Sequence, residues 1–276
     1  MLTARKMFAV ILTTGMSVAF GSLGYGAVVQ DFNDLNPGLM SGQGGGVGLL
    51  GNWAGTGTID VIAGDLDSPL YSRPQSGTSQ SVQGDYSQGR QNNRNLASPM
   101  SGSIWFSFLV NNPTVPASGT GGSRGGISFN NTGYSPGAPR VLSAGRHLVV
   151  NPVGNTLAWR DNQFTANQTG LVVGQMIVGP GNDSINVWVD PDLMANTDIW
   201  NHPTTYSSTA YNFADSISGL GVMTYASGGG TGAIVDNVLL GNSQFAVTGV
   251  PEPSTFLIWS LGLLGLAWYA RRRRTK

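Results

Sequence analysis

The sequence contains no cysteine among its 276 residues. Disulfide bonds, thiolate metal sites and cysteine nucleophiles are therefore excluded. A chain of this length can bury a core large enough to fold without such cross-links. The 7 tryptophans, 8 tyrosines and 10 phenylalanines supply large apolar side chains for that core, so the composition is that of a folded chain.

Charged residues are scarce as well, at 10% of the chain, and lysine occurs only as Lys6 and Lys276 near the two ends. Between the ends lie seven arginines and thirteen aspartates, which give this middle region six net negative charges. Such a region lacks the basic surface that binds the phosphate backbone of nucleic acids, so we expect no nucleic-acid partner. The basic residues at both ends suggest membrane topology signals instead.

Glutamate occurs once, as Glu252, and histidine twice, as His147 and His202. Glycoside hydrolases use a pair of carboxyl groups that commonly includes a glutamate. Neither a Gly-x-Ser-x-Gly elbow nor a His-Glu-x-x-His helix accompanies the histidines. We therefore expect that the protein is not an enzyme.

Residues 1–26 have the layout of a secretory signal peptide, because a short basic start precedes the apolar run Met7–Phe20 and a group of small residues. Cleavage is expected after Gly26 or Ala27, and we favour Gly26. The alternative is an uncleaved anchor, but the run is short for a membrane span, which needs about 20 residues. We expect export through the Sec machinery.

Residues 249–276 combine three features in order. A proline-bracketed motif comes first, followed by an apolar segment at 255–270 and a basic tail at 271–276. The motif consists of Val250, Pro251, Glu252, Pro253 and Ser254, and the tail begins with Arg271, Arg272, Arg273 and Arg274. We expect a transmembrane helix at about 255–270, short but extended by interfacial side chains. Arginines held in the cytoplasm would place the rest of the chain outside.

This tail resembles the PEP-CTERM sorting signal, which has the same motif, a short helix rich in glycine and leucine, and a terminal arginine cluster. The resemblance implies recognition of Pro251, Glu252 and Pro253 by exosortase, a membrane processing enzyme of Gram-negative bacteria that make exopolysaccharide. It also implies a precursor anchored in the inner membrane, from which the ectodomain reaches the cell surface or the extracellular matrix. The alternative is an ordinary tail anchor after a chance Pro-Glu-Pro.

Residues 27–248 form the predicted ectodomain, in which short segments alternate side chains with the period of two that is typical of β-strands. Clusters of glycine, proline, asparagine and serine separate these segments. The expected strands are Thr58–Ile62, Ser103–Val110, Gly126–Asn130, His147–Val150, Thr156–Arg160, Leu171–Val178, Ser184–Val189, Gly219–Tyr225 and Ala233–Leu240. At least nine short strands with no helices between them predict an all-β fold, an antiparallel β-sandwich or jelly roll.

The order of the segments resembles the concanavalin-like or laminin-G-like jelly roll common in PEP-CTERM proteins. The matching pieces are DFNDLN, GQGGGVG and NWAG near the start, WFSFLV, the pair LVVGQMIV and INVWVDPD, and the closing VDNVLLG. The resemblance implies a lectin-like fold, which by itself does not establish sugar binding.

Two groups of residues are candidate binding sites. Asp183, Asp190 and Asp192 would offer oxygen ligands to Ca²⁺, but turn-forming aspartates account for the same pattern and we favour turns, with no cofactor. Trp105 and Trp188 lie opposite the apolar stripes of their strands, where they would form either a sugar platform or a packing layer. We favour packing.

The sequence therefore favours an exported protein with a binding or structural ectodomain, associated with carbohydrate or exopolysaccharide in a biofilm. A secreted carbohydrate-active enzyme with the same anchor is the alternative. An ice-binding adhesin is a more distant one, because Thr56-Gly57-Thr58 is not repeated.

Overall fold

The computed structural model describes residues 28–30, 32–56, 59–64, 66, 80–84, 90–113, 122–130, 139–151, 158–211, 215–226, 231–249 and 271. The predicted signal peptide at 1–26, the motif Val250–Ser254, the apolar segment 255–270 and Arg272–Arg274 lie outside the described residues. Arg271 is helical and exposed. None of the helices formed by the described residues is long and apolar enough to cross a membrane.

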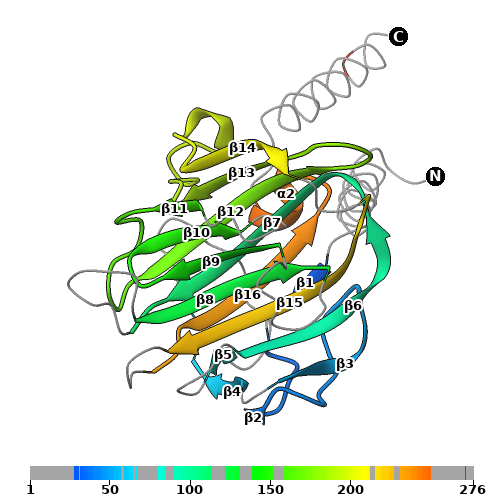
Figure 1. Cartoon of the computed structure of the whole chain (residues 1–276), viewed down its shortest axis with the longest axis vertical. Helices are drawn as coiled ribbons and strands as arrows, with labels where there is room; N and C mark the ends of the chain where they lie inside the picture. The colour runs from blue at the N-terminus through cyan, green and yellow to red at the C-terminus, as the bar shows by residue number, and fades with distance from the viewer. Residues whose placement is uncertain are drawn as a thin grey trace.

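The described strands form two antiparallel sheets (Figure 1). Sheet A has nine strands. Eight of them follow the order β14 (Tyr206–Tyr211), β13 (Asp183–Val189), β12 (Thr169–Val178), β7 (Gly102–Asn111), β16 (Ile234–Gly241), β5 (Gln80–Gly84), β4 (Ile59–Ala63) and β2 (Gly38–Leu39), and β1 (Val28–Gln30) also pairs with β16. Sheet B has seven strands in the order β11 (Ala158–Arg160), β10 (His147–Asn151), β9 (Arg140–Ala144), β8 (Ser123–Phe129), β15 (Ile217–Ala226), β6 (Arg90–Met100) and β3 (Leu49–Thr56).

The inner faces of the two sheets enclose the main hydrophobic core. Phe106 and Phe108 of β7 belong to the same buried cluster as Ile127 and Phe129 of β8. The rings of Phe106 and Phe129 lie at 57° to each other, with centroids 5.4 Å apart, so the two sheets meet directly at this point. The predicted antiparallel β-sandwich is confirmed.

All nine expected segments overlap observed strands. Seven strands among the described residues were not expected, namely β1, β2, β3, β5, β9, β14 and the polar strand β6. Its Asn92 and Arg94 are buried although their sequence neighbourhood is polar. The Arg94 guanidinium lies 5.6 Å from the centre of the Trp53 ring and donates a hydrogen bond to the carbonyl of Gly45. Long-range partners thus bury a strand that its own hydrophobic pattern does not identify.

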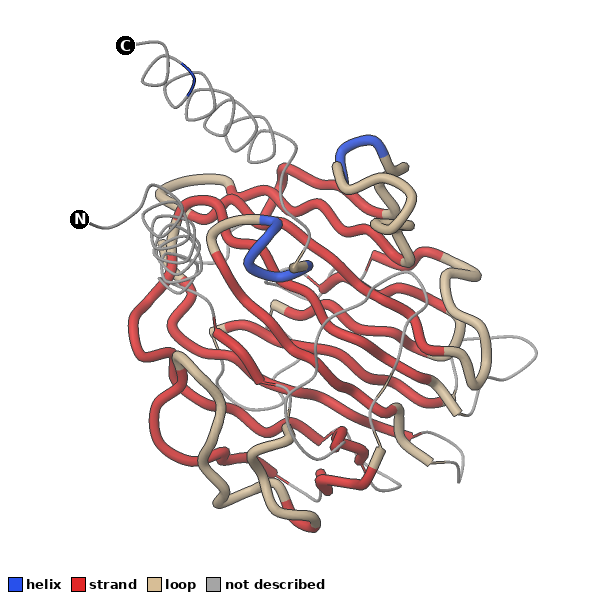
Figure 2. The backbone as a smooth tube through the Cα atoms, turned by 180° about the vertical axis from the view of Figure 1, so that it is seen from behind, coloured by secondary structure: helices blue, strands red, loops and turns tan. Residues whose placement is uncertain are grey.

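The outer face of sheet A is also covered. The short helices η2 (Ile199–Asn201) and α2 (Gln244–Thr248) contribute Ile199 and Val247 to a second buried cluster with side chains of β7, β12 and β13. Figure 2 shows α2 lying over this sheet. Strand β7 is therefore buried on both faces.

Helix α2 is fixed to sheet A immediately before the C-terminal motif. Ser107 Oγ donates to the carbonyl of Val247 at 2.5 Å, and Gln244 Nε2 donates to that of Thr197 at 2.7 Å. The helix ends at Gly249, whose φ of 68° is the left-handed conformation that favours glycine at this position. The last residue of the described sandwich thus directly precedes Val250.

Gly174 on β12 provides the space that Phe106 occupies. A Cβ atom at Gly174 would lie 2.0 Å from Cζ of Phe106, whereas one at Gly179, just after the strand, would meet nothing within 4 Å. Gly174→Ala should therefore destabilise the protein by about 1–3 kcal/mol through overpacking. Gly179→Ala is the matched control and should have little effect. Urea unfolding of both variants measures the difference, and equal stabilities would contradict this account of the core.

Candidate functional site

Trp105 and Trp188 lie together on the outer face of sheet A. Their rings stack with centroids 6.1 Å apart and planes 13° from parallel. They are only 5% and 1% exposed, because the segment that follows β13 and helix α2 cover them. In this structure the pair is a packing layer, and no ring face is open to a sugar.

Trp200 in η2 is the tryptophan that the sequence analysis missed on this side. It is 53% exposed, and its ring meets Trp188 edge-on at 5.1 Å and Trp105 at 5.9 Å. Asp198 fixes the turn by accepting a hydrogen bond from the backbone N–H of Trp200 at 3.1 Å. Its segment has no strand periodicity, so only the tertiary contacts reveal its place over the other two rings.

The three calcium candidates do not converge. Asp183 and Asp190 stand at opposite ends of β13, which separates them by roughly 20 Å at about 3.3 Å per residue. Each carboxylate accepts a backbone N–H instead: Asp183 from Gly179 at 3.0 Å and Asp192 from Ala195 at 3.0 Å within their turns, and Asp190 from Leu171 on the neighbouring strand at 2.7 Å. No group of three or more metal-ligating side chains occurs among the described residues.

The outer face of sheet B, in contrast, carries a hollow. Directly paired residues share a face, so the register aligns Met223, Gly126, Leu142, Val149 and Trp159 in one row across β15, β8, β9, β10 and β11. A neighbouring row aligns Tyr225, Arg124, Ala144 and His147. We call this site the aromatic hollow; it is lined by Arg124, Gly125, Arg140, Leu142, Val149, Trp159, Met223, Thr224 and Tyr225.

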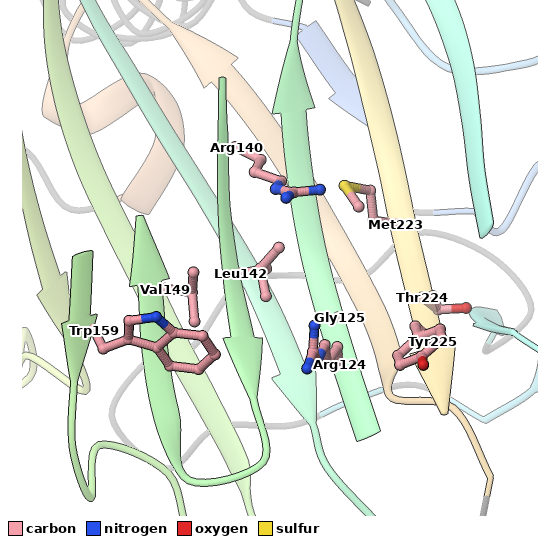
Figure 3. Close-up of a pocket in the computed structure, with 9 residues that line it drawn as sticks. All are labelled: Arg124, Gly125, Arg140, Leu142, Val149, Trp159, Met223, Thr224 and Tyr225. Carbon is pink, nitrogen blue, oxygen red and sulfur yellow. The ribbon is translucent and has the colours of Figure 1, made fainter. Parts of the chain in front are cut away.

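The floor of the aromatic hollow is apolar, and aromatic rings stand at its two ends. Leu142, Val149 and Met223 are buried in a small cluster of their own, against which Trp159 packs. Figure 3 shows Trp159 and Tyr225 on opposite sides of this floor. Four strand spacings separate them, about 19 Å at roughly 4.8 Å each, so the hollow is longer than a single sugar ring.

Polar contacts hold both rings in place. The guanidinium of Arg124 lies 5.3 Å from the centre of the Tyr225 ring, a cation–π contact. The imidazole of His147 meets Trp159 edge-on at 5.7 Å, and its Nδ1 is 2.8 Å from a carboxylate oxygen of Asp161. Neighbouring side chains therefore restrict Trp159 and Tyr225, the aromatic residues at the rim of the hollow.

The aromatic hollow is shallow. Its cavity volume is about 40 Å³, enough for a few water molecules, whereas pockets that enclose small molecules measure about 300–1,000 Å³. A ligand would lie across this surface rather than inside it.

Comparison with known families decides the nature of the C-terminal segment. Residues 249–274 match the family described as the PEP-CTERM protein-sorting motif. The chain carries a PEP-CTERM sorting motif. The resemblance noted from the sequence is confirmed, and with it export through a C-terminal signal from a membrane-anchored bacterial precursor. The PEP-CTERM motif begins at Gly249, where α2 ends.

Solved structures resemble the sandwich only distantly. A protein of unknown function from Shewanella oneidensis MR-1 has a TM-score of 0.47 and 10% identity, over 78% of this chain and 84% of that one. Lectin II from Ulex europaeus has a TM-score of 0.40 and 9% identity, over 76% and 98%. The receptor-binding domain of botulinum neurotoxin type G has a TM-score of 0.43 and 8% identity, over 79% and 47%. No functional inference is drawn from likenesses this distant. No curated protein matches the chain.

The environment of Asp190 predicts how the stability of the protein depends on pH. The residue as a whole is exposed, but its carboxylate accepts the backbone N–H of Leu171 at 2.7 Å. Burial raises the pKa of this carboxyl group, while the hydrogen bond from Leu171 opposes the rise. A raised pKa means that the folded state binds the proton more tightly than the unfolded state. Protonation of Asp190 therefore adds to the free energy of unfolding. This contribution is complete below the pKa of the carboxyl group in the unfolded state and is lost as the pH rises through its pKa in the folded state.

Asp190→Asn should raise the melting temperature near pH 7 and leave it almost unchanged near pH 3. Asparagine keeps the oxygen acceptor, tolerates the φ of 51° at this position and removes the buried charge. Asp192→Asn, on the exposed turn two residues later, is the control. Thermal unfolding followed by circular dichroism at both pH values measures the effect, and a lower melting temperature near pH 7 would contradict it.

Proposed function

We propose that this protein is exported by a Gram-negative bacterium, processed by an exosortase-type enzyme, and displayed at the cell surface or in the extracellular matrix, where it binds polysaccharide without catalysis. The sorting step is supported by the PEP-CTERM motif at residues 249–274. The binding step is supported by the aromatic hollow on sheet B. That hollow is the observation on which the proposed ligand class depends.

The shape of the aromatic hollow favours a polysaccharide. Sugar rings have apolar C–H faces that pack on aromatic rings, and Trp159 and Tyr225 present such rings at the two ends of an apolar floor. The distance between them suits several linked sugar units. The guanidinium groups of Arg124 and Arg140 supply hydrogen-bond donors beside that path.

The location of the aromatic hollow is also compatible with ligand binding while the protein is anchored at its C-terminal end. Helix α2, the last element before the PEP-CTERM motif, packs on the outer face of sheet A. The hollow lies on the outer face of sheet B. The chain therefore leaves the sandwich on the side away from the proposed binding face, which would remain accessible while the precursor is anchored.

The non-catalytic part of the proposal follows from the side chains near the hollow. The whole chain before Glu252 lacks glutamate, and a cavity of about 40 Å³ gives little shelter from water. The rival hypothesis, a carbohydrate-active enzyme, would use the His147–Asp161 pair, which is within hydrogen-bond distance at 2.8 Å. Release of reducing ends, abolished by Asp161→Asn, would favour that rival.

Replacing the rim aromatics tests the binding site. Trp159→Ala and Tyr225→Ala should each weaken polysaccharide binding on the order of tenfold, since one aromatic contact contributes about 1 kcal/mol or more. Trp200→Ala, an equally drastic change at a half-exposed tryptophan over sheet A, is the control. The measurement is affinity electrophoresis of the processed protein on polysaccharide from the producing cells and on a panel of purified polysaccharides. Binding that is lost in Trp200→Ala but retained in Trp159→Ala would move the site to sheet A.

Changing Glu252 tests the sorting step. Glu252→Ala should leave export and folding intact, because Gly249 already completes α2 and the sandwich core lies before it. The unprocessed precursor should accumulate in the inner membrane. Replacing Arg271–Arg274 with glutamines should act differently, because it weakens the topology signal. Membrane fractionation and intact mass in the native host distinguish these results, and identical mass and location for wild type and Glu252→Ala would show that the motif is not recognised.

A further inference from the structure

The two sheets divide the charged residues of the strands between them. The described strands of sheet B contain five arginines and no acidic residue, namely Arg90, Arg94, Arg124, Arg140 and Arg160. The described strands of sheet A contain no arginine or lysine and three aspartates, Asp60, Asp183 and Asp236. The segment after β13, which covers sheet A, adds Asp190, Asp192 and Asp198. Asp183, Asp236 and Arg94 are buried. The exposed or half-exposed charges beside the two sheets therefore include Arg124, Arg140 and Arg160 of sheet B and Asp190, Asp192 and Asp198 over sheet A.

Two of the five arginines line the aromatic hollow. Arg124 is positioned by the Tyr225 ring at 5.3 Å, and Arg140 pairs across the sheet with Ser128 and Asn151. Figure 3 shows the two arginines at different levels of the hollow, between Trp159 and Tyr225. A guanidinium group donates two parallel hydrogen bonds to a carboxylate, and Arg is the side chain best suited to that geometry.

The other arginines of sheet B have different environments. Arg94 stacks over Trp53, and Arg160 stacks 5.0 Å from the centre of the Tyr206 ring, which belongs to sheet A. Near Trp159, the carboxylate of Asp161 lies 2.8 Å from His147 Nδ1. Arg124 and Arg140 are the arginines of the described strands that line the aromatic hollow.

We propose that the polysaccharide bound at the aromatic hollow is a polyuronate, whose carboxylates pair with Arg124 and Arg140 while its rings pack on Trp159 and Tyr225. This inference rests on the proposed binding function and names its ligand class. The exposed Asp190 and Asp192, in the segment over sheet A, repel such a polymer, whereas Arg124 and Arg140 on the outer face of sheet B attract it. Charge therefore selects which face the polymer contacts.

The experiment compares polymers that differ only in charge. Alginate and polygalacturonate are each offered to the processed protein beside the same polymer after its carboxyl groups have been reduced to primary alcohols. The native polymers should bind at least tenfold more tightly than the reduced ones. Raising the salt from about 0.05 M to 0.5 M should remove most of this difference, because the Debye length falls well below 10 Å.

Two arginine variants and one control locate the charge effect. Arg124→Gln and Arg140→Gln should each weaken polyuronate binding by roughly tenfold, as expected for loss of one charge-assisted contact. Arg146→Gln makes the same charge change at an exposed turn residue that does not line the hollow, and it should bind like the wild type. Melting temperatures of all three variants verify that the fold is intact.

The outcomes separate the two proposals. Equal binding of native and reduced polymers, lost in Trp159→Ala, would retain the polysaccharide-binding function and overturn the polyuronate inference. Binding of dextran sulfate without binding of any polyuronate would overturn it too. Binding of no polysaccharide by the wild type would overturn both proposals. Equal losses in Arg124→Gln, Arg140→Gln and Arg146→Gln would show a general charge effect and would overturn the site assigned to the two arginines.

Discussion

The contact between Phe106 and Phe129 is the constraint on which the architecture depends, because it joins the inner faces of the two sheets. Each ring is fully buried, and burying a phenylalanine side chain contributes about 1.5–3 kcal/mol. The absence of a side chain at Gly174 allows Phe106 to reach this position, since a Cβ there would occupy the space of the ring. Because the inner faces form the core, the outer faces of the two sheets can have different environments.

The outer faces of the two sheets differ in how the described residues cover them. On sheet A, helix α2 and the segment after β13 bury the stacked pair Trp105 and Trp188. On the outer face of sheet B, the described residues form a shallow hollow lined by aromatic and cationic side chains. On sheet A, helix α2 packs against the sheet and directly precedes the PEP-CTERM motif. The proposed polysaccharide site lies on the outer face of sheet B.

Most of the fold could be predicted from the sequence, because strands such as Ser103–Val110 carry their inward side chains in strict alternation. The polar strand β6 could not, since its burial depends on Trp53 and on the neighbouring strands rather than on its own hydrophobicity. The calcium candidates failed to converge for a similar reason. Asp183 and Asp190 are close along the chain, but an extended strand holds them about 20 Å apart.

The sequence by itself determined the sorting motif, because Pro251, Glu252 and Pro253 and the residues around them form a contiguous signal that needs no tertiary context. It also determined the class of fold, because periodicity is local. Only the tertiary structure decided which tryptophans face solvent and which residues form the aromatic hollow. Trp159, Arg124 and Tyr225 come from three strands that are distant along the chain, and strand order and register bring them together. Register is fixed by the packing of the whole sandwich, so a local pattern does not contain it.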